Sequence, residues 1–331
     1  MTDVSILTEG ELRQCAVINE EALLAVESAF TWLQEGKVEM PPIMHIEVAD
    51  AEKHRGDVDI KSAYVRGLDR FAVKLGSGFF DNPLKGLPSS NAMMVMMSAH
   101  TGFCEAVLLD NGYLTDLRTG LAGAVAAKYL APEHIETVGV IGSGAQARYQ
   151  IESLALVRNF KRLLVSARSA ERLVDYVSDM QQRLSGVEVV VADSLEQLVR
   201  DSQVVVCTTS SAEPLIQAEW LHPGLHITAM GSDLAGKQEL SAAVLLTADQ
   251  VVCDRKSQCY VMGELQHVKD QLSDSEVLEL GQLTSGEKVG RRSEEAITIC
   301  DLTGTGVQDT AIANLSCDKA QQLGLGTVVT L

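Results

Sequence analysis

A run of small residues, 142-GSGAQA-147, stands where a short apolar segment changes into residues that favour a helix. The first glycine, Gly142, permits a tight turn from strand to helix, and Gly144 lets the backbone approach a bulky anion. Ala147 lets the helix and strand pack closely, while the helix N-terminus offers N–H groups and a positive dipole end. The pattern predicts a pyrophosphate site; a tight turn that binds nothing is the alternative. The residues expected around the pyrophosphate are therefore Gly142 and Gly144.

The end of the next apolar run, 163-LLVSARSAERL-173, indicates which dinucleotide would fit. A carboxylate at this point binds a ribose 2′-hydroxyl, whereas an arginine accommodates a 2′-phosphate. The tip of the run carries Arg168 and Ser169, with Arg172 close behind, and no acidic residue. We therefore expect NAD(P)H as cofactor, with NADP(H) favoured; Arg168 stacking on the adenine of either dinucleotide is the alternative.

Three charged residues stand where their surroundings would not require charge. Lys74 lies in an apolar strand-like run, and alternation turns it away from its apolar neighbours, so it needs a partner such as a ligand carboxylate. Arg118, followed by Thr119 near the start of an alanine-rich helix, could bind a carboxylate or phosphate in a bidentate manner. Asp233 follows a strand, where loops of parallel sheets bind ligands. An exposed lysine, a surface arginine and a turn aspartate are the alternatives.

Other kinds of site find little support. His222 and His226 are separated by Pro223 and Gly224, which break the helix that would place both on one face, and neither HExxH nor zinc-type Cys/His spacing occurs. We expect no metal site. A GxSxG nucleophile motif is also missing. Met93, Met94, Met96 and Met97 are typical of a strand core rather than of a cofactor site.

Composition indicates a packed protein with partners of low molecular mass. The formal charge of −18 over 331 residues disfavours nucleic acid and anionic membranes as partners. Seven cysteines without CxxC spacing indicate reduced thiols, and the N-terminal residues resemble no signal peptide. These features predict a cytoplasmic protein without a membrane segment.

The elements that must position these residues fall into two groups. Residues 11–42 have the spacing of one amphipathic helix, and short strand-like runs follow between 43 and 110, which suits an antiparallel or mixed sheet. A helix is expected from 115 to 131, followed by strands and helices in alternation, which indicates a parallel sheet. The segment 297–331 reads as a strand, a glycine-rich turn and a helix that could return to the first group. The predicted fold class is α/β, with a central Rossmann-type doubly wound parallel sheet and an α+β domain.

Taken together, these stretches resemble the ornithine cyclodeaminase and mu-crystallin superfamily, in particular its ectoine-utilisation and iminosuccinate reductase members. The resemblance runs over nearly the whole chain. Its segments are Pro41-Pro42, Lys74, 86-GLPS-89, 113-YLTDLRTGLAGAVAAKYLA-131, 142-GSGAQA-147, 230-MGSDLAGKQEL-240 and 301-DLTGTGVQD-309.

The resemblance implies a homodimer with two domains in each subunit. Residues 1–119 with 304–331 would form the dimerisation and substrate-binding domain, and 120–303 the Rossmann dinucleotide-binding domain. Catalytic roles are implied for Lys74, Arg118 and Asp233. Cofactor contacts are implied or expected at Ser89, Arg118, Thr119, Gly142, Gly144, Ala145, Gln146, Arg168, Ser169, Thr208, Met230, Lys237 and Thr305, with Gly306 beside the last.

One departure from the family pattern affects the choice of substrate. Cyclodeaminases place an arginine after the Pro-Pro turn to bind the α-carboxylate, and this chain has Ile43 there. The carboxylate must then bind elsewhere, for which Lys61, Arg66 and His45 are candidates, or the substrate differs.

The expected reaction is the reduction of a small imino acid, with iminosuccinate to aspartate as the first choice because two cationic side chains suit a dicarboxylate. Lys74 and Arg118 would hold the carboxylate, and Asp233 or a water that it orients would protonate the imine nitrogen. The alternatives are an ornithine cyclodeaminase, a reductase of cyclic imines, an ectoine-pathway enzyme and a cofactor-binding protein without turnover.

Overall fold

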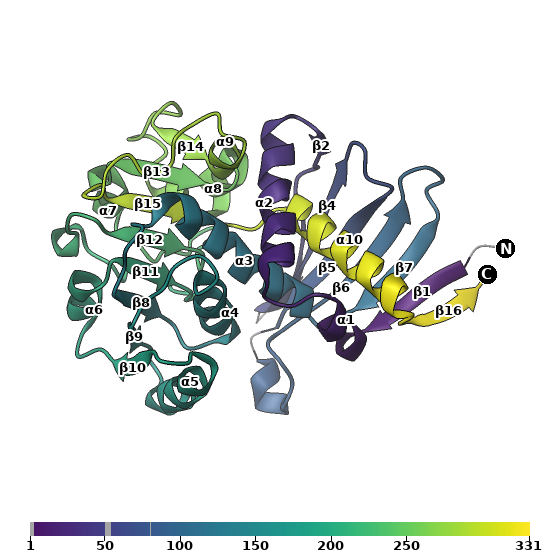
Figure 1. Cartoon of the computed structure of the whole chain (residues 1–331), viewed down its shortest axis with the longest axis horizontal. Helices are drawn as coiled ribbons and strands as arrows, with labels where there is room; N and C mark the ends of the chain where they lie inside the picture. Colours follow the sequence, from purple (N-terminus) through teal and green to yellow (C-terminus); the bar gives the residue numbers. More distant parts are fainter. Residues whose placement is uncertain (1–2, 50–53, 80) are drawn as a thin grey trace. The chain divides into compact units, whose positions relative to one another are not determined.

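The computed structural model describes residues 3–49, 54–79 and 81–331. The chain separates into two compact units, coloured in sequence order in Figure 1. Unit 1 comprises Met1–Arg118 and Thr305–Leu331, and unit 2 comprises Thr119–Gly304. Unit 1 is therefore built from both ends of the chain, whereas unit 2 is continuous.

Unit 1 is a mixed sheet with helices on one side. Its strands lie in the order β16-β1-β7-β6-β5-β4-β2, with β3 paired to β4 away from this path. All neighbours are antiparallel except β1 and β7. The elements are β1 (Asp3–Thr8), α1 (Glu9–Cys15), α2 (Glu20–Gln34), β2 (Val38–Glu39), β3 (Met44–Ala49), β4 (His54–Val65), β5 (Arg70–Gly78), the 3-10 helix η1 (Asn82–Lys85), β6 (Ser90–Ser98), β7 (Cys104–Leu109), α10 (Gly306–Leu323) and β16 (Thr327–Thr330).

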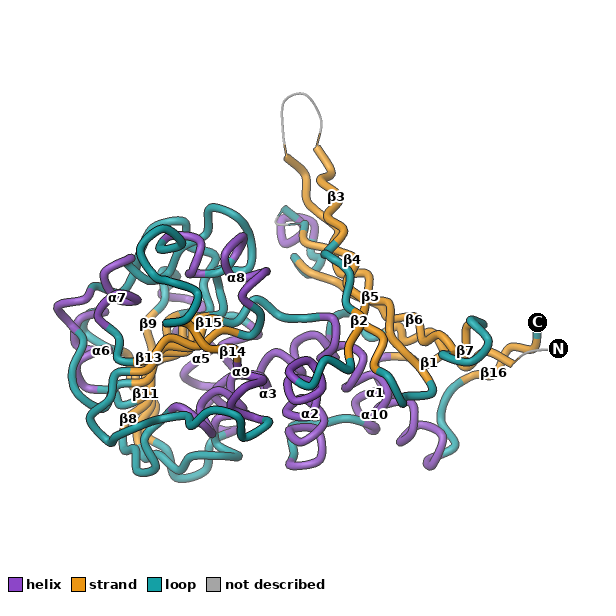
Figure 2. Tube along the Cα trace, turned by 90° about the horizontal axis from the view of Figure 1, so that it is seen from above, coloured by secondary structure: helices purple, strands orange, loops and turns teal. Residues whose placement is uncertain are grey.

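Helices pack on only one of the two faces of this sheet. Strand alternation directs one set of side chains onto α10, where Ala63 and Val65 pack with Val307 and Ala311. Figure 2 shows α1, α2 and α10 together on this inner face. The expected antiparallel or mixed sheet is present, and Met94 and Met96 lie in its core, fully buried. The other side chains of the alternation form an outer face.

The single helix expected over residues 11–42 is wrong. Two helices occur instead, because α1 ends at Cys15 and residues 16–19 are not helical. Asn19 is extended, and its side chain accepts a hydrogen bond from the N–H of Ala22, which starts α2. The apolar spacing continues across the break, and this is why periodicity alone joined the two helices.

Unit 2 is an eight-stranded sheet in which every pair is parallel. The first elements are the helix α3 (Tyr113–Leu130), which begins in unit 1, then β8 (Thr137–Ile141), α4 (Ala145–Leu154), β9 (Arg162–Ser166), α5 (Ala170–Arg183), β10 (Glu188–Val191), α6 (Leu195–Asp201) and β11 (Val204–Cys207). They are followed by η2 (Ala218–Trp220), β12 (His226–Ala229), α7 (Ala242–Thr247), β13 (Gln250–Cys253), α8 (Lys256–Met262), η3 (Glu264–His267), β14 (Val277–Glu279), α9 (Leu280–Thr284) and β15 (Thr298–Asp301).

The strand order in unit 2 is β10-β9-β8-β11-β12-β15-β13-β14. The chain moves outward from β8 to β10, then returns to the other side of β8 with β11. In open α/β sheets, the crevice at the carboxyl ends of the strands beside such a reversal is where ligands bind. The fold class expected from the sequence is thus confirmed, and the glycine run follows the strand at the reversal, β8.

Side chains of both strand faces fill the core of unit 2, as is usual for a sheet with helices on both sides. One cluster is centred on β8, β9, α4 and α5, the other on β11 to β15. The seven cysteines are free thiols, and all except Cys104 are buried. Among the described helices, none is both long and apolar enough to cross a bilayer.

Candidate active site

Lys74 is a buried charge on the inner face of the unit 1 sheet. It lies in β5, is 3% exposed and points away from Phe71, Val73 and Leu75, as the alternation predicted. Its Nζ lies 2.9 Å from Oδ2 and 3.1 Å from Oδ1 of Asp309. The exposed alternative for this lysine is therefore excluded.

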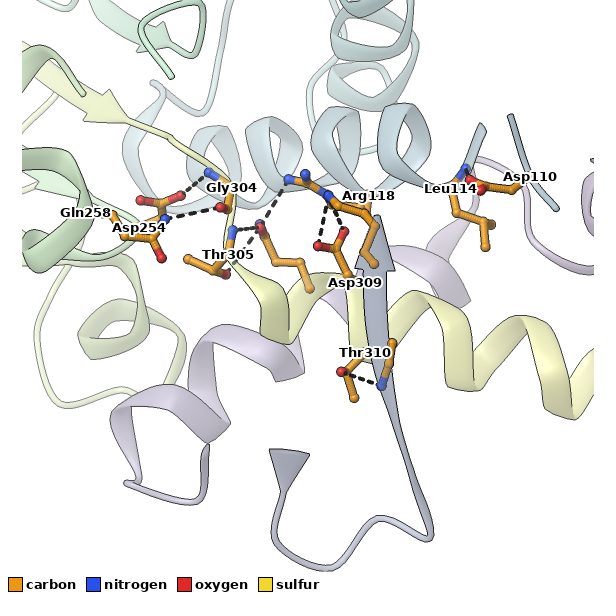
Figure 3. Close-up of polar contacts among 12 residues, drawn as sticks. Asp110, Leu114, Arg118, Asp254, Gln258, Gly304, Thr305, Asp309 and Thr310 are labelled. Carbon is orange, nitrogen blue, oxygen red and sulfur yellow. Dashed lines mark hydrogen bonds and ion pairs between the residues drawn. The ribbon is translucent and has the colours of Figure 1, made fainter. Parts of the chain in front are cut away.

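Arg118 reaches the same carboxylate from α3. Its Nε donates to Oδ1 of Asp309 at 3.0 Å, and its Nη1 donates to Oε1 of Gln308 at 3.3 Å, as drawn in Figure 3. The arginine is 4% exposed, so the surface alternative is excluded here too. Its expected place at the helix start needs correction, because α3 begins five residues earlier, at Tyr113. We call Lys74, Arg118 and Asp309 the buried triad.

Asp309 was missed by the sequence analysis, although it ends the quoted segment 301-DLTGTGVQD-309. The start of α10 fixes its place. A Cβ on Gly306 would come within 2.6 Å of the carbonyl oxygen of Ser62, so only glycine lets α10 lie this close to β4. Thr310 adds register, because its hydroxyl donates to the carbonyl of Ala63 and accepts from the N–H of Ala72. The sequence signal that could have identified Asp309 is the one that identified Lys74: a charged residue between neighbours that pack in the core.

Burial and charge act on the triad in opposite senses. Burial lowers the pKa of Lys74 to about 7, against the attraction of Asp309 and with the help of Arg118 and Lys61. Burial alone would raise the pKa of Asp309, but Lys74 and Arg118 hold it below its usual range. The carboxylate is therefore ionised at neutral pH, while Lys74 loses its proton more readily than an exposed lysine does.

Asp110 is a second buried acid in unit 1. It follows β7, and its Oδ2 accepts from the N–H of Leu114 at 2.9 Å at the start of α3 (Figure 3). Burial raises its pKa to about 6, and Lys74 opposes this shift. It thus belongs to the electrostatic surroundings of Lys74.

The glycine run in unit 2 has the geometry that a pyrophosphate site requires. Gly142 has φ of +125°, and a Cβ there would lie 2.3 Å from Oγ1 of Thr208. Gly144 is the N-cap of α4, so it brings no side-chain oxygen to the helix N-terminus, and a Cβ there would meet nothing within 4 Å. Ala145 is exposed beside it, Gln146 is partly buried, and Ala147 packs in the core. The loop leaves open space in front of the first turn of α4, which fits a bound diphosphate.

Two neighbouring loops at the same edge of the sheet are joined by a buried acid that the sequence analysis did not single out. Glu239, fully buried, accepts from the N–H of Thr209 at 2.6 Å and from the N–H of Gly231 at 2.8 Å. These loops carry the expected cofactor contacts Thr208, which is half-buried, and Met230, which is 8% exposed. Burial raises the pKa of Glu239 to about 7.

Asp233 and Lys237 lie together on the loop after β12. Nζ of Lys237 is 2.5 Å from Oδ1 of Asp233, whose side chain is 53% exposed. An exposed ion pair of this kind is structurally weak, so the aspartate remains accessible to a ligand.

The remaining expected contacts lie at element ends. Arg168 and Ser169 are exposed after β9, and Ser169 caps α5 by accepting from the N–H of Arg172. Ser89 is partly buried just before β6, and its carbonyl accepts from the N–H of Phe79. Thr119 is the first residue of unit 2, where its carbonyl accepts from Gln150 at 2.7 Å.

Thr305 is the N-cap of α10, in a capping box with Gln308. The preceding residues, at the end of unit 2, are held by α8 and the loop before it, as Figure 3 shows. Asp254 accepts from the N–H groups of Thr303 and Gly304 at 2.9 and 2.6 Å, and Gln258 donates to the carbonyl of Gly304. The segment leading into α10 is therefore fixed within unit 2 up to Gly304.

The three candidates for replacing the missing arginine differ in the contacts that their side chains make. His45 lies 2.8 Å from Oδ1 of Asp59, and Arg66 donates to the carbonyl of Gly36. Lys61 is the direct cross-strand partner of Lys74 and affects the pKa of both Lys74 and Asp309. Lys61 is thus the candidate nearest to the triad.

A doubly wound sheet with this glycine loop, together with a buried cationic cluster, defines a class of dinucleotide-dependent enzymes. The sequence profile of the ornithine cyclodeaminase/mu-crystallin family matches residues 4–323, and the chain belongs to this family. The resemblance and the expected enzyme class, an oxidoreductase, are thereby confirmed.

Curated relatives align along almost the whole chain. An uncharacterised cyclodeaminase of Sinorhizobium fredii is 44% identical over 99% of both proteins. An alanine dehydrogenase of Archaeoglobus fulgidus is 36% identical over 98% of this chain and 97% of its own. An iminosuccinate reductase of Paracoccus denitrificans is 31% identical over 94% of this chain and 95% of its own.

Solved structures agree closely with the fold. An archaeal alanine dehydrogenase dimer with bound NAD has a TM-score of 0.92 and 34% identity, with full coverage of both chains. The Δ1-pyrroline-2-carboxylate reductase of Thermococcus litoralis, in complex with NADH and L-proline, has a TM-score of 0.91 and 29% identity over 98% of this chain and 99% of its own. These proteins bind NAD or NADH and, where their names state it, form a dimer or bind an amino acid.

Proposed function

We propose that this protein is an NAD(P)H-dependent reductase that converts a small imino acid into the amino acid. The buried triad is the observation that carries the proposal, because it places two cationic side chains around one carboxylate in a nearly dry environment. Such a cluster suits a small acid better than a neutral or cationic ligand.

The triad supports binding of a substrate carboxylate. Lys74 has three N–H donors and Arg118 has five, and their bonds to Asp309 and Gln308 use only some of them. Lys61, on the neighbouring strand, adds a third cation and stands in for the arginine that Ile43 replaces. The similarity to the iminosuccinate and pyrroline-2-carboxylate reductases supports an imine as the other substrate group.

The chemical step needs a hydride, a proton and a dry environment. A bound nicotinamide dinucleotide would supply the hydride to the imine carbon. Asp233, or a water that it orients, donates the proton to the imine nitrogen, while Lys74 and Arg118 keep the carboxylate in place. Asp233 suits this role because its side chain is exposed, so a substrate or a water can reach its carboxylate.

For the cofactor, NADP(H) is proposed over NAD(H), with Gly142, Gly144, Ala145 and Gln146 around the diphosphate. Arg168 and Ser169 are exposed after β9, where a ribose 2′-phosphate would lie, and no carboxylate precedes Glu171 there. Replacing Arg168 with alanine should raise the Kd for NADPH about tenfold or more and leave that for NADH nearly unchanged. Equal loss for both would assign Arg168 to the adenine ring instead.

The test of the reaction is spectrophotometric. Purified protein is mixed with NADPH or NADH and with pyruvate plus ammonia, oxaloacetate plus ammonia, or Δ1-pyrroline-2-carboxylate, beside an ammonia assay on ornithine. Cofactor oxidation that depends on the imine and is lost in Lys74→Ala and Asp233→Asn supports the proposal.

An ornithine cyclodeaminase is the second candidate, favoured by the relative of that name at 44% identity. It would release ammonia from ornithine without net change in the cofactor, and this outcome would replace the reductase. Ile43 argues against a cyclodeaminase, because the arginine expected at this position to bind the substrate carboxylate is missing.

We also propose a homodimer formed through the outer face of the unit 1 sheet. By strand register this face carries apolar side chains that are only partly buried: Ile60, Tyr64, Phe71, Val73, Leu75, Met93, Val95, Met97 and Val107. The helices of the unit lie on the other face (Figure 2), and a contiguous apolar surface that no helix of the unit covers is typical of an interface. A Val95→Lys variant should elute as a monomer in size-exclusion chromatography with light scattering; an unchanged dimer would place the interface elsewhere.

A further inference from the structure

Among the described residues, Asp309 is the acid that both cations of the triad contact. It is fully buried, at 0% exposure, and it lies on α10, 235 residues after Lys74 and 191 after Arg118. The contacts that place it, Gly306 on β4 and Thr310 on β4 and β5, are backbone contacts to the two strands that also carry Lys61 and Lys74. The carboxylate is therefore held with little freedom against Nζ of Lys74.

The charged groups that act on Lys74 from the surrounding elements are two cations and two acids. Arg118 approaches from α3 and Lys61 from β4, while β6 presents the apolar Met94. Asp110 acts on Lys74 from the end of β7, but its carboxyl group bonds to the N–H of Leu114 instead of to Nζ. Within the part of the chain that the structure describes, Asp309 is thus the anion in direct contact with the ammonium group.

We propose that Asp309 is a positioning residue of the active site, which keeps Lys74 charged and aimed so that the lysine can bind the substrate carboxylate. The role rests on the proposed function of Lys74 as a carboxylate ligand. Without the charge of Asp309, burial and two neighbouring cations all favour the neutral amine, which donates poorly to a carboxylate.

The role has a measurable signature in the pH profile. In the free protein Lys74 must be charged to bind substrate, so kcat/KM falls as the pH rises through the pKa of Lys74. Removal of the charge of Asp309 lowers that pKa further, which moves the alkaline limb of the profile to lower pH. KM rises at neutral pH, while kcat at saturating substrate changes less.

The experiment compares Asp309→Asn with the wild type, using Δ1-pyrroline-2-carboxylate as a preformed imine. The alkaline limb of kcat/KM should move down by at least one pH unit, with KM at pH 7.5 raised at least tenfold. Asp318→Asn is the matched control, because Asp318 lies on the same helix and pairs with Arg70 at an exposed site. An unshifted limb with a lower kcat in Asp309→Asn would overturn the proposal.

A second variant separates charge from packing. Asp309→Glu keeps the charge, so its alkaline limb should stay within about half a unit of the wild type even if KM changes. A limb displaced as far as in Asp309→Asn would show that packing around Asp309 governs Lys74, and it would also overturn the proposal.

A readout without substrate distinguishes failure of this proposal from failure of the proposed function. In protein with ¹³C-labelled lysine, the Cε resonance of Lys74, assigned by its loss in Lys74→Arg, reports the titration directly. A lower midpoint in Asp309→Asn supports the electrostatic role even if every imine is refused, whereas equal midpoints refute it even if imines are reduced.

Discussion

The two units bury ionisable groups in different ways. In unit 1 the triad pairs opposite charges directly, and Asp309 is ionised between two cations. In unit 2 the acids Glu239, Glu264, Asp254 and Asp301 are fully buried, and within the described residues they form no ion pair. Their oxygens accept instead from backbone N–H groups of loops that follow the strands.

The difference indicates what each arrangement does. A cationic pair with donors to spare can take up a ligand beside Asp309, which is the basis of the proposed carboxylate site. Most carboxyl oxygens of these unit 2 acids accept from the chain itself, although Oδ1 of Asp301 has no partner among the described residues, so the acids fix the shape of the loops near the proposed cofactor site.

The two arrangements also give opposite pH dependence of stability. The pKa of Lys74 is lowered to about 7 from an ordinary 10.5, so the unfolded chain binds the proton more tightly, and this contribution to stability increases as pH rises from 7 to 10.5. The pKa values of Glu239 and Asp301 are raised to about 7 and that of Glu264 to about 9, each chiefly by burial. Their contribution is fully present below the ordinary values near 4 and falls as pH rises through the folded values.

The largest effect is expected from breaking the triad. Asp309→Leu leaves two buried cations without their shared anion, which should lower the free energy of unfolding by about 3–5 kcal/mol. Urea unfolding in a Trp220→Phe background reports on unit 1 through Trp32, since the chain has 2 tryptophans, one in each unit. Asp318→Leu, at an exposed site on the same helix, should cost less than about 0.5 kcal/mol. A loss below about 1 kcal/mol for Asp309→Leu would mean that water reaches the triad.

A smaller effect is expected from Glu264→Gln, and the pH dependence of stability that Glu264 contributes is opposite to that of Lys74. The amide cannot titrate, so the variant should gain about 2 kcal/mol relative to the wild type as pH rises from about 6.5 to 8. Urea unfolding at several pH values, followed through Trp220 in a Trp32→Phe background, measures this gain. Parallel curves for variant and wild type would show that Glu264 is ionised in the folded protein.

Glu239→Gln tests whether the backbone-bound acids shape the cofactor site. The amide group turns an N–H toward either Thr209 or Gly231, so one backbone donor loses its acceptor. The Kd of the dinucleotide should rise about tenfold, which corresponds to about 1.4 kcal/mol. Titration of cofactor fluorescence without substrate measures this Kd, and an unchanged value would remove Glu239 from the description of the site.

The smallest effect is expected at the exposed ion pair of unit 2. Lys237→Ala breaks a contact to Asp233, yet solvent screening should keep the change in the free energy of unfolding within about 0.5 kcal/mol. Thermal unfolding measures the change. A loss as large as that of Asp309→Leu would contradict the distinction between exposed and buried pairs drawn here.

Much of unit 2 could be predicted from the sequence, because each strand and helix of a βα series has its own local pattern. The glycine loop was located by residues 142–147 alone, since the turn and the phosphate site depend on neighbours in the chain. Lys74 was singled out because a charge in an apolar strand requires a partner.

Long-range pairing was harder to predict. Asp309 contacts Lys74 across 235 residues, and a single sequence carries no record of that contact. The strands β1 and β16, at one end of the unit 1 sheet, were missed for the same reason, because they are short and pair with each other across the two ends of the chain. The break between α1 and α2 depends on one capping side chain, Asn19, and an analysis of hydrophobic periodicity takes no account of capping residues.

The division of unit 1 between the two ends of the chain has a consequence for biosynthesis. Unit 2 is continuous and can fold while the ribosome is still translating, but unit 1 lacks α10 until the last residues emerge. At a translation rate of roughly 5–20 residues per second, Asp309 is synthesised about ten seconds or longer after Lys74 and Arg118. During that interval two cations destined for the interior have no anion, so the nascent sheet must stay open and hydrated. A premature stop codon between positions 305 and 309 should therefore yield a chain that chaperones retain and proteases degrade, even though the whole of unit 2 is encoded.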